Sequence, residues 1–204
     1  MPKNKTDTHI KIIAAAKKEF LEKGFEKASM RDIAANANMS AAGLYRHFKD
    51  KEDLFDTLID PLMNTMEEIF IKQTKRSYTI LENGNFDEMW SGQTDLDIFL
   101  NLIYENYDKI RLLICCSGGT KHKNFVHEFV SAEEKETLKY MSAAREKGYA
   151  VKEILPQELH LLLSAYFSAI FEIVMHEFTR EDAEHYLDTL QKFFYPGWRN
   201  VLGL

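Results

Sequence analysis

Cysteine is nearly absent from this sequence of 204 residues, and its two cysteines, Cys115 and Cys116, are neighbours. Adjacent cysteines rarely form a disulfide without strain, because the bridge requires a specific separation of the two Cα atoms. The sequence therefore does not predict a disulfide-stabilised secreted domain. We interpret the two cysteines as reduced thiols of a cytoplasmic protein.

Proline, glycine and long apolar runs are also scarce. The chain has four prolines and nine glycines, and its longest apolar stretch, residues 159–175, is interrupted by His160 and Glu172. No membrane span is therefore expected, and the N-terminal residues have no apolar segment typical of a signal peptide. Apolar residues make up 45% of the chain and charged residues 28%, which predicts a globular protein and not a disordered one.

Acidic residues outnumber basic residues over the whole chain, but the basic residues are concentrated near the N-terminus. The formal net charge is −6; residues 1–51 nevertheless hold 11 Lys and Arg against 6 Asp and Glu, whereas residues 52–204 hold 15 against 26. An acidic chain with a basic N-terminal segment predicts that this segment alone meets a polyanion. Chance variation of surface charge is the simpler alternative.

Helical periodicity dominates the N-terminal segment. Residues 8–23 carry apolar side chains at three- and four-residue intervals, including Ile10 and Phe20, which predicts an amphipathic helix that ends at Gly24. Ser29 suits the N-cap of a second helix that reaches residue 36, and Asp32 is placed to complete a capping box with it.

A tight turn and a short third helix follow. Such a turn needs one residue with positive φ, and Asn38 tolerates that conformation. Ser40 caps a helix over residues 41–48, in which Leu44 and Phe48 point inward. This order of elements is typical of a helix-turn-helix DNA-binding domain. A plain helical hairpin is the alternative, and the narrow apolar face of the third helix argues against it.

These motifs resemble the N-terminal domain of the tetracycline-repressor (TetR) family of transcriptional regulators. The resemblance covers residues 10–58, with one departure at Asn38, where the family usually has Gly. It implies an all-α homodimer, in which a three-helix helix-turn-helix domain binds a palindromic operator and a larger helical domain binds a small molecule that releases the DNA. The matching residues are Phe20, Gly24, Met30-Arg31-Asp32-Ile33-Ala34, Met39-Ser40, Gly43-Leu44-Tyr45, His47-Phe48 and Lys51-Glu52-Asp53-Leu54.

DNA contacts are expected from the second and third helices and from the start of the fourth. Tyr45 and His47 resemble the backbone-contacting pair of the family, and Lys51 begins a helix where its charge favours a phosphate. Arg46 suits either a bidentate contact with guanine or a phosphate contact, and both remain open. Small side chains at the front of the third helix allow a close approach to the bases. The predicted set is Ser29, Arg31, Ser40, Ala41, Ala42, Gly43, Tyr45, Arg46, His47 and Lys51.

The predicted DNA-binding domain covers residues 1–51, and the ligand-binding and dimerisation domain covers residues 52–204. A connecting helix starts at about residue 51 and contains Pro61. A polar break at 82–95 separates it from further helices, which are predicted at 96–116, 124–147, 157–178 and from about 180 to Pro196, with a resumption as far as residue 202 left open. The last two are expected to pair with their copies in a second subunit; a purely internal core role is the alternative.

Aromatic side chains of the middle helices are the candidates for an effector pocket, although most aromatic residues in this region are expected to be ordinary core. Their number fits a flat or hydrophobic small molecule, whose identity the sequence leaves open. The predicted ligand-binding residues are Trp90, Phe99, Tyr104, Tyr107, Phe125, Phe129, Phe167 and Phe171.

Catalytic and metal-binding patterns are missing. Cys115, Cys116, His122 and His127 are the only conceivable metal cluster, and their spacing fits no known zinc site, so neither a metal nor a cofactor is expected. The sequence contains no phosphate loop and no nucleophile motif, so an enzyme is not expected. The alternative function is a helical protein-interaction adaptor that no longer reads DNA. An adaptor does not need a basic N-terminal segment, so the presence of this segment argues against the alternative.

Overall fold

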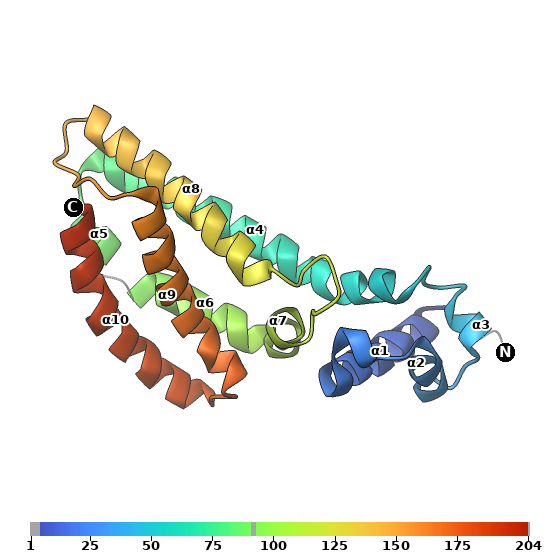
Figure 1. Ribbon diagram of the computed structural model, residues 1–204. Helices are drawn as coiled ribbons and strands as arrows, with labels where there is room; N and C mark the ends of the chain where they lie inside the picture. The colour runs from blue at the N-terminus through green and yellow to red at the C-terminus, as the bar shows by residue number, and fades with distance from the viewer. Residues whose placement is uncertain (1–4, 91–92, 204) are drawn as a thin grey trace. The chain divides into compact units, whose positions relative to one another are not determined.

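The computed structural model describes residues 5–90 and 93–203, and within these ranges every regular element is a helix (Figure 1). The predicted all-α fold is confirmed. The chain divides into two units, the first made of residues up to 66 together with 106–123, and the second of residues 67–105 together with 124–204. The predicted boundary at residue 51 falls inside the first unit.

The first unit contains α1 (Lys5–Lys27), α2 (Met30–Asn36), α3 (Ala41–Leu44), the N-terminal half of α4 (Lys51–Asn83) and α7 (Tyr107–Cys115). The helix α1 packs against both α2 and α7, and α2 packs against α3. A segment from the middle of the sequence therefore completes the N-terminal unit.

The core of the first unit is built on α1 and α4. Ile12, Phe20 and Phe55 are completely buried, and the Phe20 and Phe55 rings meet edge-on with their centroids 5.2 Å apart. The predicted apolar face of α1 was partly wrong, because Ile10 is 60% exposed. The inward face runs through Ile12 and Ala16, two residues further along the helix.

Gly24 interrupts α1 with a positive φ of 71° and a ψ of 164°, a conformation that favours glycine. Its positive φ matches the prediction, but the helix resumes and ends at Lys27. This break turns Phe25 back toward the core. Its amide donates to the Cys116 carbonyl at 2.9 Å, and its ring stacks on Phe20 at 5.9 Å.

The second unit contains the C-terminal part of α4 together with α5 (Asp87–Trp90), α6 (Gln93–Glu105), α8 (Phe125–Glu146), α9 (Pro156–Met175) and α10 (Arg180–Leu202). The helices α8 and α9 pack against each other, and α10 contacts α6 and α9. Helix α5 lies inside the predicted polar break, and the single helix predicted over 96–116 is instead divided into α6 and α7.

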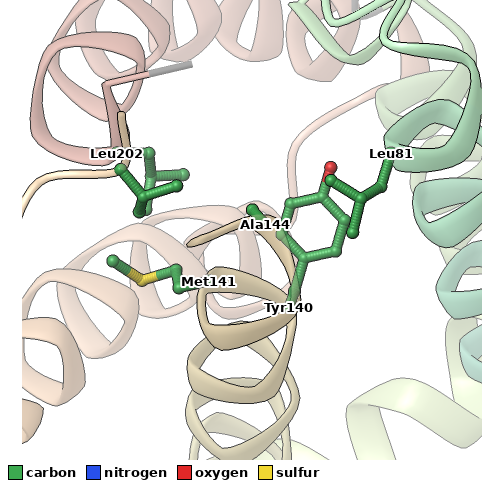
Figure 2. Close-up of a cluster of buried hydrophobic side chains, with 6 residues drawn as sticks. Leu81, Tyr140, Met141, Ala144 and Leu202 are labelled. Carbon is green, nitrogen blue, oxygen red and sulfur yellow. The ribbon is translucent and has the colours of Figure 1, made fainter. Parts of the chain in front are cut away.

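Helices far apart in the sequence share a core at one end of the second unit. Figure 2 shows Leu81 of α4 and Leu202 of α10 lying near Tyr140, Met141 and Ala144 of α8, and all five side chains are buried. The end of α4 is thereby held in the second unit, while its start belongs to the first.

Helix α9 contains the apolar stretch that the sequence analysis compared with a membrane span. Pro156–Met175 is long and apolar enough to cross a bilayer by length and composition, properties that the core helices of globular proteins share. In this structure α9 packs against α8 and α10. Its buried face includes Leu159, Phe167 and Ile170, as expected for a core helix.

Candidate DNA-binding surface

The cap residue Ser29 and one side chain of α1 fix the N-terminus of α2. Ser29 Oγ accepts hydrogen bonds from the amides of Arg31 at 3.2 Å and Asp32 at 3.4 Å, which confirms the predicted N-cap. The predicted role of Asp32 was wrong, because its carboxylate binds Lys23 Nζ at 3.1 Å. The Ser29 amide donates instead to Glu19 Oε1 at 3.3 Å. Glu19 is only 2% exposed, so α2 is anchored to a buried carboxylate of α1.

The turn after α2 adopts the predicted conformation. Asn38 has a φ of 56°, in the left-handed region that asparagine tolerates better than most side chains. The amides of Asn38 and Met39 donate to the carbonyls of Ala35 and Ala34, each at 3.0 Å. These bonds fix the direction in which the chain leaves α2 and therefore the direction of α3.

Ser40 caps α3 as predicted, because its Oγ accepts from the Gly43 amide at 3.1 Å. The regular helix is shorter than the predicted 41–48 and ends at Leu44. Beyond that point the Arg46 and His47 amides donate to carbonyls three residues earlier, at 3.2 Å and 2.9 Å. The recognition segment therefore ends in a tighter 3₁₀-like turn, which changes the directions of its last side chains.

Gly43 has a second reason for its small size, besides the one that the sequence suggested. It is buried within α3, and a Cβ at this position would lie 3.2 Å from Met39 Cε and 3.3 Å from Ser40 Oγ. Glycine therefore lets α3 close onto its own turn. This packing is a further reason for glycine at this position, and a role of Gly43 in the close approach of DNA stays a prediction.

The other predicted contact residues of α2 and α3 are accessible. Residues 40–47 contain Arg46 and no carboxylate, so this surface is suited to a polyanion. We call the exposed surface formed by residues 40–47 the recognition ridge. The exposed members of the predicted set are Arg31, Ser40, Ala42, Tyr45, Arg46 and His47, and Ser29 and Ala41 are partly exposed.

Lys51 has a structural role that the sequence did not predict. Its Nζ donates to the carbonyls of Phe25 at 2.6 Å, Glu26 at 3.1 Å and Ala28 at 3.0 Å, and lies 4.4 Å from the centre of the Phe25 ring. Burial lowers the pKa of this ammonium below its ordinary value. An ammonium has three N–H donors, and all are used here, so the side chain closes the end of α1 and is not arranged to hold a phosphate.

Five of the eight predicted ligand-binding residues meet in the second unit. Phe99 of α6, Phe125 and Phe129 of α8, and Phe167 and Phe171 of α9 form one aromatic cluster. Phe129 lies at its centre, with ring centroids 4.9 Å from Phe167 and 6.1 Å from Phe171. This cluster joins α6, α8 and α9.

The other three candidates lie elsewhere. Tyr104 donates its hydroxyl to the Phe178 carbonyl at 2.8 Å, and the Arg180 guanidinium lies 5.9 Å from the centre of its ring, so it fixes the turn between α9 and α10. Tyr107 belongs to α7 in the first unit. The side chain of Trp90 lies outside the described residues.

Glu133 of α8 is a titratable group that sequence reasoning missed. Burial, with a smaller contribution from the charge of Glu136, raises the pKa of its carboxyl to about 7. It lies one helical turn after Phe129 and so follows the aromatic cluster along α8. No sequence motif marks this residue, because its pKa depends on the burial that the fold creates.

Capped α2, a turn with positive φ and a short α3 with an exposed, carboxylate-free ridge define a helix-turn-helix protein of the DNA-binding class. Comparison with known proteins agrees. Residues 12–58 match the family model described as bacterial regulatory proteins, tetR family. The N-terminal part of the chain is therefore similar to the regulators of this family.

Two curated relatives and one solved structure illustrate the similarity. The chain is 32% identical over 69 residues to the HTH-type transcriptional repressor BepR of Brucella suis, and these residues cover 34% of this chain and 33% of BepR. It is 33% identical over 125 residues to an HTH-type transcriptional regulator of Staphylococcus aureus, covering 61% of this chain and 62% of that protein. The matches therefore span less than two thirds of either relative.

The solved structure is that of NalD, the secondary repressor of the MexAB-OprM multidrug efflux pump in Pseudomonas aeruginosa. The TM-score is 0.52 at 17% sequence identity, and the match covers 93% of this chain and 97% of NalD. At this identity the likeness concerns the fold, which extends through both units of the chain.

Proposed function

We propose that this protein is a cytoplasmic, homodimeric transcriptional repressor that binds a palindromic DNA operator through α2 and α3 and releases it when a small molecule binds the second unit. The observation that carries the proposal is the recognition ridge. Its exposed Tyr45, Arg46 and His47 follow a helix whose start is fixed by Ser40 and whose direction is fixed by the Asn38 turn.

Within the ridge, the side chains divide by chemistry. The Tyr45 hydroxyl and the His47 ring N–H are donors suited to phosphate oxygens, which position a protein on DNA without reading its sequence. Arg46 and the methyl groups of Ala41 and Ala42 suit base edges in the major groove. Base discrimination is therefore assigned to Ala41, Ala42 and Arg46, and general affinity to Tyr45 and His47, which flank Arg46 in the sequence.

An exposed stripe on α9 supports a dimer. Leu161 is 68% exposed and Met175 is 56% exposed, and the exposed Ala165 and Ser168 lie between them at helical spacing. On α10, Phe193 is 77% exposed. Apolar side chains of this size on two neighbouring helices favour burial against a second copy of the same helices, which closes as a symmetric pair.

The aromatic cluster of α6, α8 and α9 supports an apolar effector. Its ring faces and edges suit a flat molecule better than a strongly hydrated one. Binding that changes the packing of these helices reaches the recognition ridge through α4, which is part of both units. A coupling free energy of about 1–3 kcal/mol changes the affinity for the operator by about 5–150-fold.

Selection of bound fragments from random DNA tests operator binding. A palindromic sequence should be enriched, and Arg46→Ala should weaken its binding about 10-fold or more while changing the preferred base at one position of each half-site. Lys72→Ala removes an exposed positive charge from the second unit and serves as the control. Failure to enrich any palindrome, or equal losses in the two variants, contradicts the assignment.

The dimer has its own test. Phe193→Glu places a charge on the exposed face of α10 and should give monomers in analytical ultracentrifugation, together with a large loss of operator affinity. The change Lys192→Glu at the neighbouring exposed position is the control. A dimer that survives Phe193→Glu unchanged would assign the interface to another surface.

A further inference from the structure

The loop that follows α7 holds an unusual number of polar side chains in the interior of the first unit. Ser117, Thr120 and His122 are 4%, 4% and 8% exposed. Thr120 Oγ1 donates to the Ser117 carbonyl at 2.7 Å and accepts from the His122 amide at 3.0 Å. Ser117 Oγ donates to the His122 carbonyl at 3.4 Å. These bonds hold His122 in one position on the loop.

The imidazole of His122 meets two carboxylates of α4. Its Nε2 lies 3.1 Å from Asp56 Oδ1, and Asp60 follows Asp56 by one helical turn on the same face. One nitrogen or oxygen atom from each of these three side chains lies within 4.8 Å of the other two. Residues from positions 56 and 122 are thus brought together by the fold of the first unit.

We propose that Asp56, Asp60 and His122 form a binding site for a divalent transition-metal ion such as Zn²⁺. Ligands that are about 2.0–2.2 Å from a common ion lie within about 4.4 Å of one another, so a small rotation of the aspartate side chains brings the three atoms into range. Two carboxylates and an imidazole give a mixed oxygen and nitrogen donor set, which suits Zn²⁺ or Mn²⁺, whereas Ca²⁺ and Mg²⁺ prefer oxygen alone.

A positive charge already lies at this site. Lys121 Nζ is 2.7 Å from Asp56 Oδ2, so an ammonium group pairs with one of the two carboxylates. Because the Lys121 side chain is 55% exposed, it is able to move into solvent when an ion arrives. A metal ion therefore replaces the ammonium as the counter-ion of Asp56.

The metal would join α4 to the loop after α7 more firmly than the hydrogen bond between Asp56 and His122. Both partners belong to the first unit, so the site lies in the unit that carries the recognition ridge and is separate from the aromatic cluster of the second unit. The inference does not rest on operator binding or on an effector, and its test requires neither.

Isothermal titration calorimetry of the full chain with Zn²⁺ tests the site, because it measures both the affinity and the number of ions bound per chain. The unaltered protein should bind one ion per chain. Asp60→Asn should lower the affinity at least about 10-fold, because one of three ligands is lost. Glu68→Gln removes the same charge from an exposed position of α4 and should leave the affinity unchanged. Lys121→Gln should raise the affinity several-fold, because it removes the competing cation.

His122→Gln is a further test, and it should also bind Zn²⁺ at least about 10-fold more weakly. If this buried substitution unfolds the loop, Asp60→Asn decides, since Asp60 is exposed and its replacement leaves the helix intact. Circular dichroism of each variant checks the fold. The proposal is overturned if no ion binds stoichiometrically, or if Asp60→Asn binds Zn²⁺ as well as Glu68→Gln does.

Discussion

Replacing Lys51 by methionine separates two roles for the residue that begins α4. The ammonium donates three hydrogen bonds, of 2.6 Å, 3.1 Å and 3.0 Å, to carbonyls at the end of α1. A hydrogen bond from a charged donor contributes about 1.5–3 kcal/mol. Because the site is only partly buried, water replaces some of what is lost, and we expect Lys51→Met to lower the free energy of unfolding by about 2–4 kcal/mol.

Urea unfolding monitored by circular dichroism measures this loss as a lower midpoint at an unchanged slope. Lys49→Met, at an exposed position two residues earlier, is the matched control and should change stability by less than about 0.5 kcal/mol. The salt dependence of operator binding gives the second readout. A phosphate contact predicts that Lys51→Met reduces the slope of log K against log salt by about 1, whereas a purely structural role leaves the slope unchanged. Unaltered stability together with a reduced slope would refute the structural role.

Three further substitutions probe other features. Tyr140→Phe removes a buried hydroxyl that has no hydrogen-bond partner among the described residues, so urea unfolding should show a gain of about 1 kcal/mol; a clear loss would contradict this. Glu133 has a folded-state pKa of about 7 against 4.5 ordinarily, so the folded state binds the extra proton and stability falls as the pH rises from 4.5 through 7. Glu133→Gln should remove this fall and add about 1–3 kcal/mol at pH 8, measured by urea midpoints at pH 5 and 8; equal pH profiles would exclude the raised pKa. Gly43→Ala should lower the melting temperature by the equivalent of about 1 kcal/mol, because its Cβ would press on Met39 and Ser40. An alanine within a helix usually raises stability instead. A raised melting temperature would show that the turn adjusts to the added methyl group.

Features fixed by a few neighbouring residues were predictable from the sequence. The caps at Ser29 and Ser40 and the positive φ of Asn38 depend on hydrogen bonds and sterics within three or four residues, and all three are confirmed. The tetR-family resemblance is confirmed as well. Local chemistry therefore located the helix-turn-helix, which is the part of the chain that determines its class.

Contacts between distant residues were not predictable in this way. Asp32 was the expected capping partner because it is three residues from Ser29, yet Glu19, on the preceding helix, takes that place. The break between α6 and α7 at Asn106 could not be predicted from apolar periodicity, because the periodic pattern continues across it. His122 was compared only with its sequence neighbours Cys115, Cys116 and His127, whereas its partner Asp56 lies 66 positions away.

The recognition ridge and the aromatic cluster were predictable only in part. Helical spacing identified Tyr45, Arg46 and His47 as outward-facing, and composition identified five phenylalanines that do meet. Tyr104 is on the same helix as Phe99 but donates its hydroxyl to the Phe178 carbonyl, and Tyr107 is on α7; no local pattern marks either placement. The assignment of the ridge residues to DNA binding and of the five phenylalanines to ligand binding remains a proposal.

The return of residues 106–123 to the first unit has a consequence for dissecting the protein. The N-terminal unit is discontinuous in sequence, so a fragment that ends at residue 66 lacks α7 and the loop that follows it. Such a fragment loses the Cys116 carbonyl that binds the Phe25 amide and the Asp108 carboxylate that pairs with Lys17. A protease that cuts within α4 would therefore not release an independently folding DNA-binding module, and an exchange of modules between relatives requires two crossover points after α4 as well as one within it.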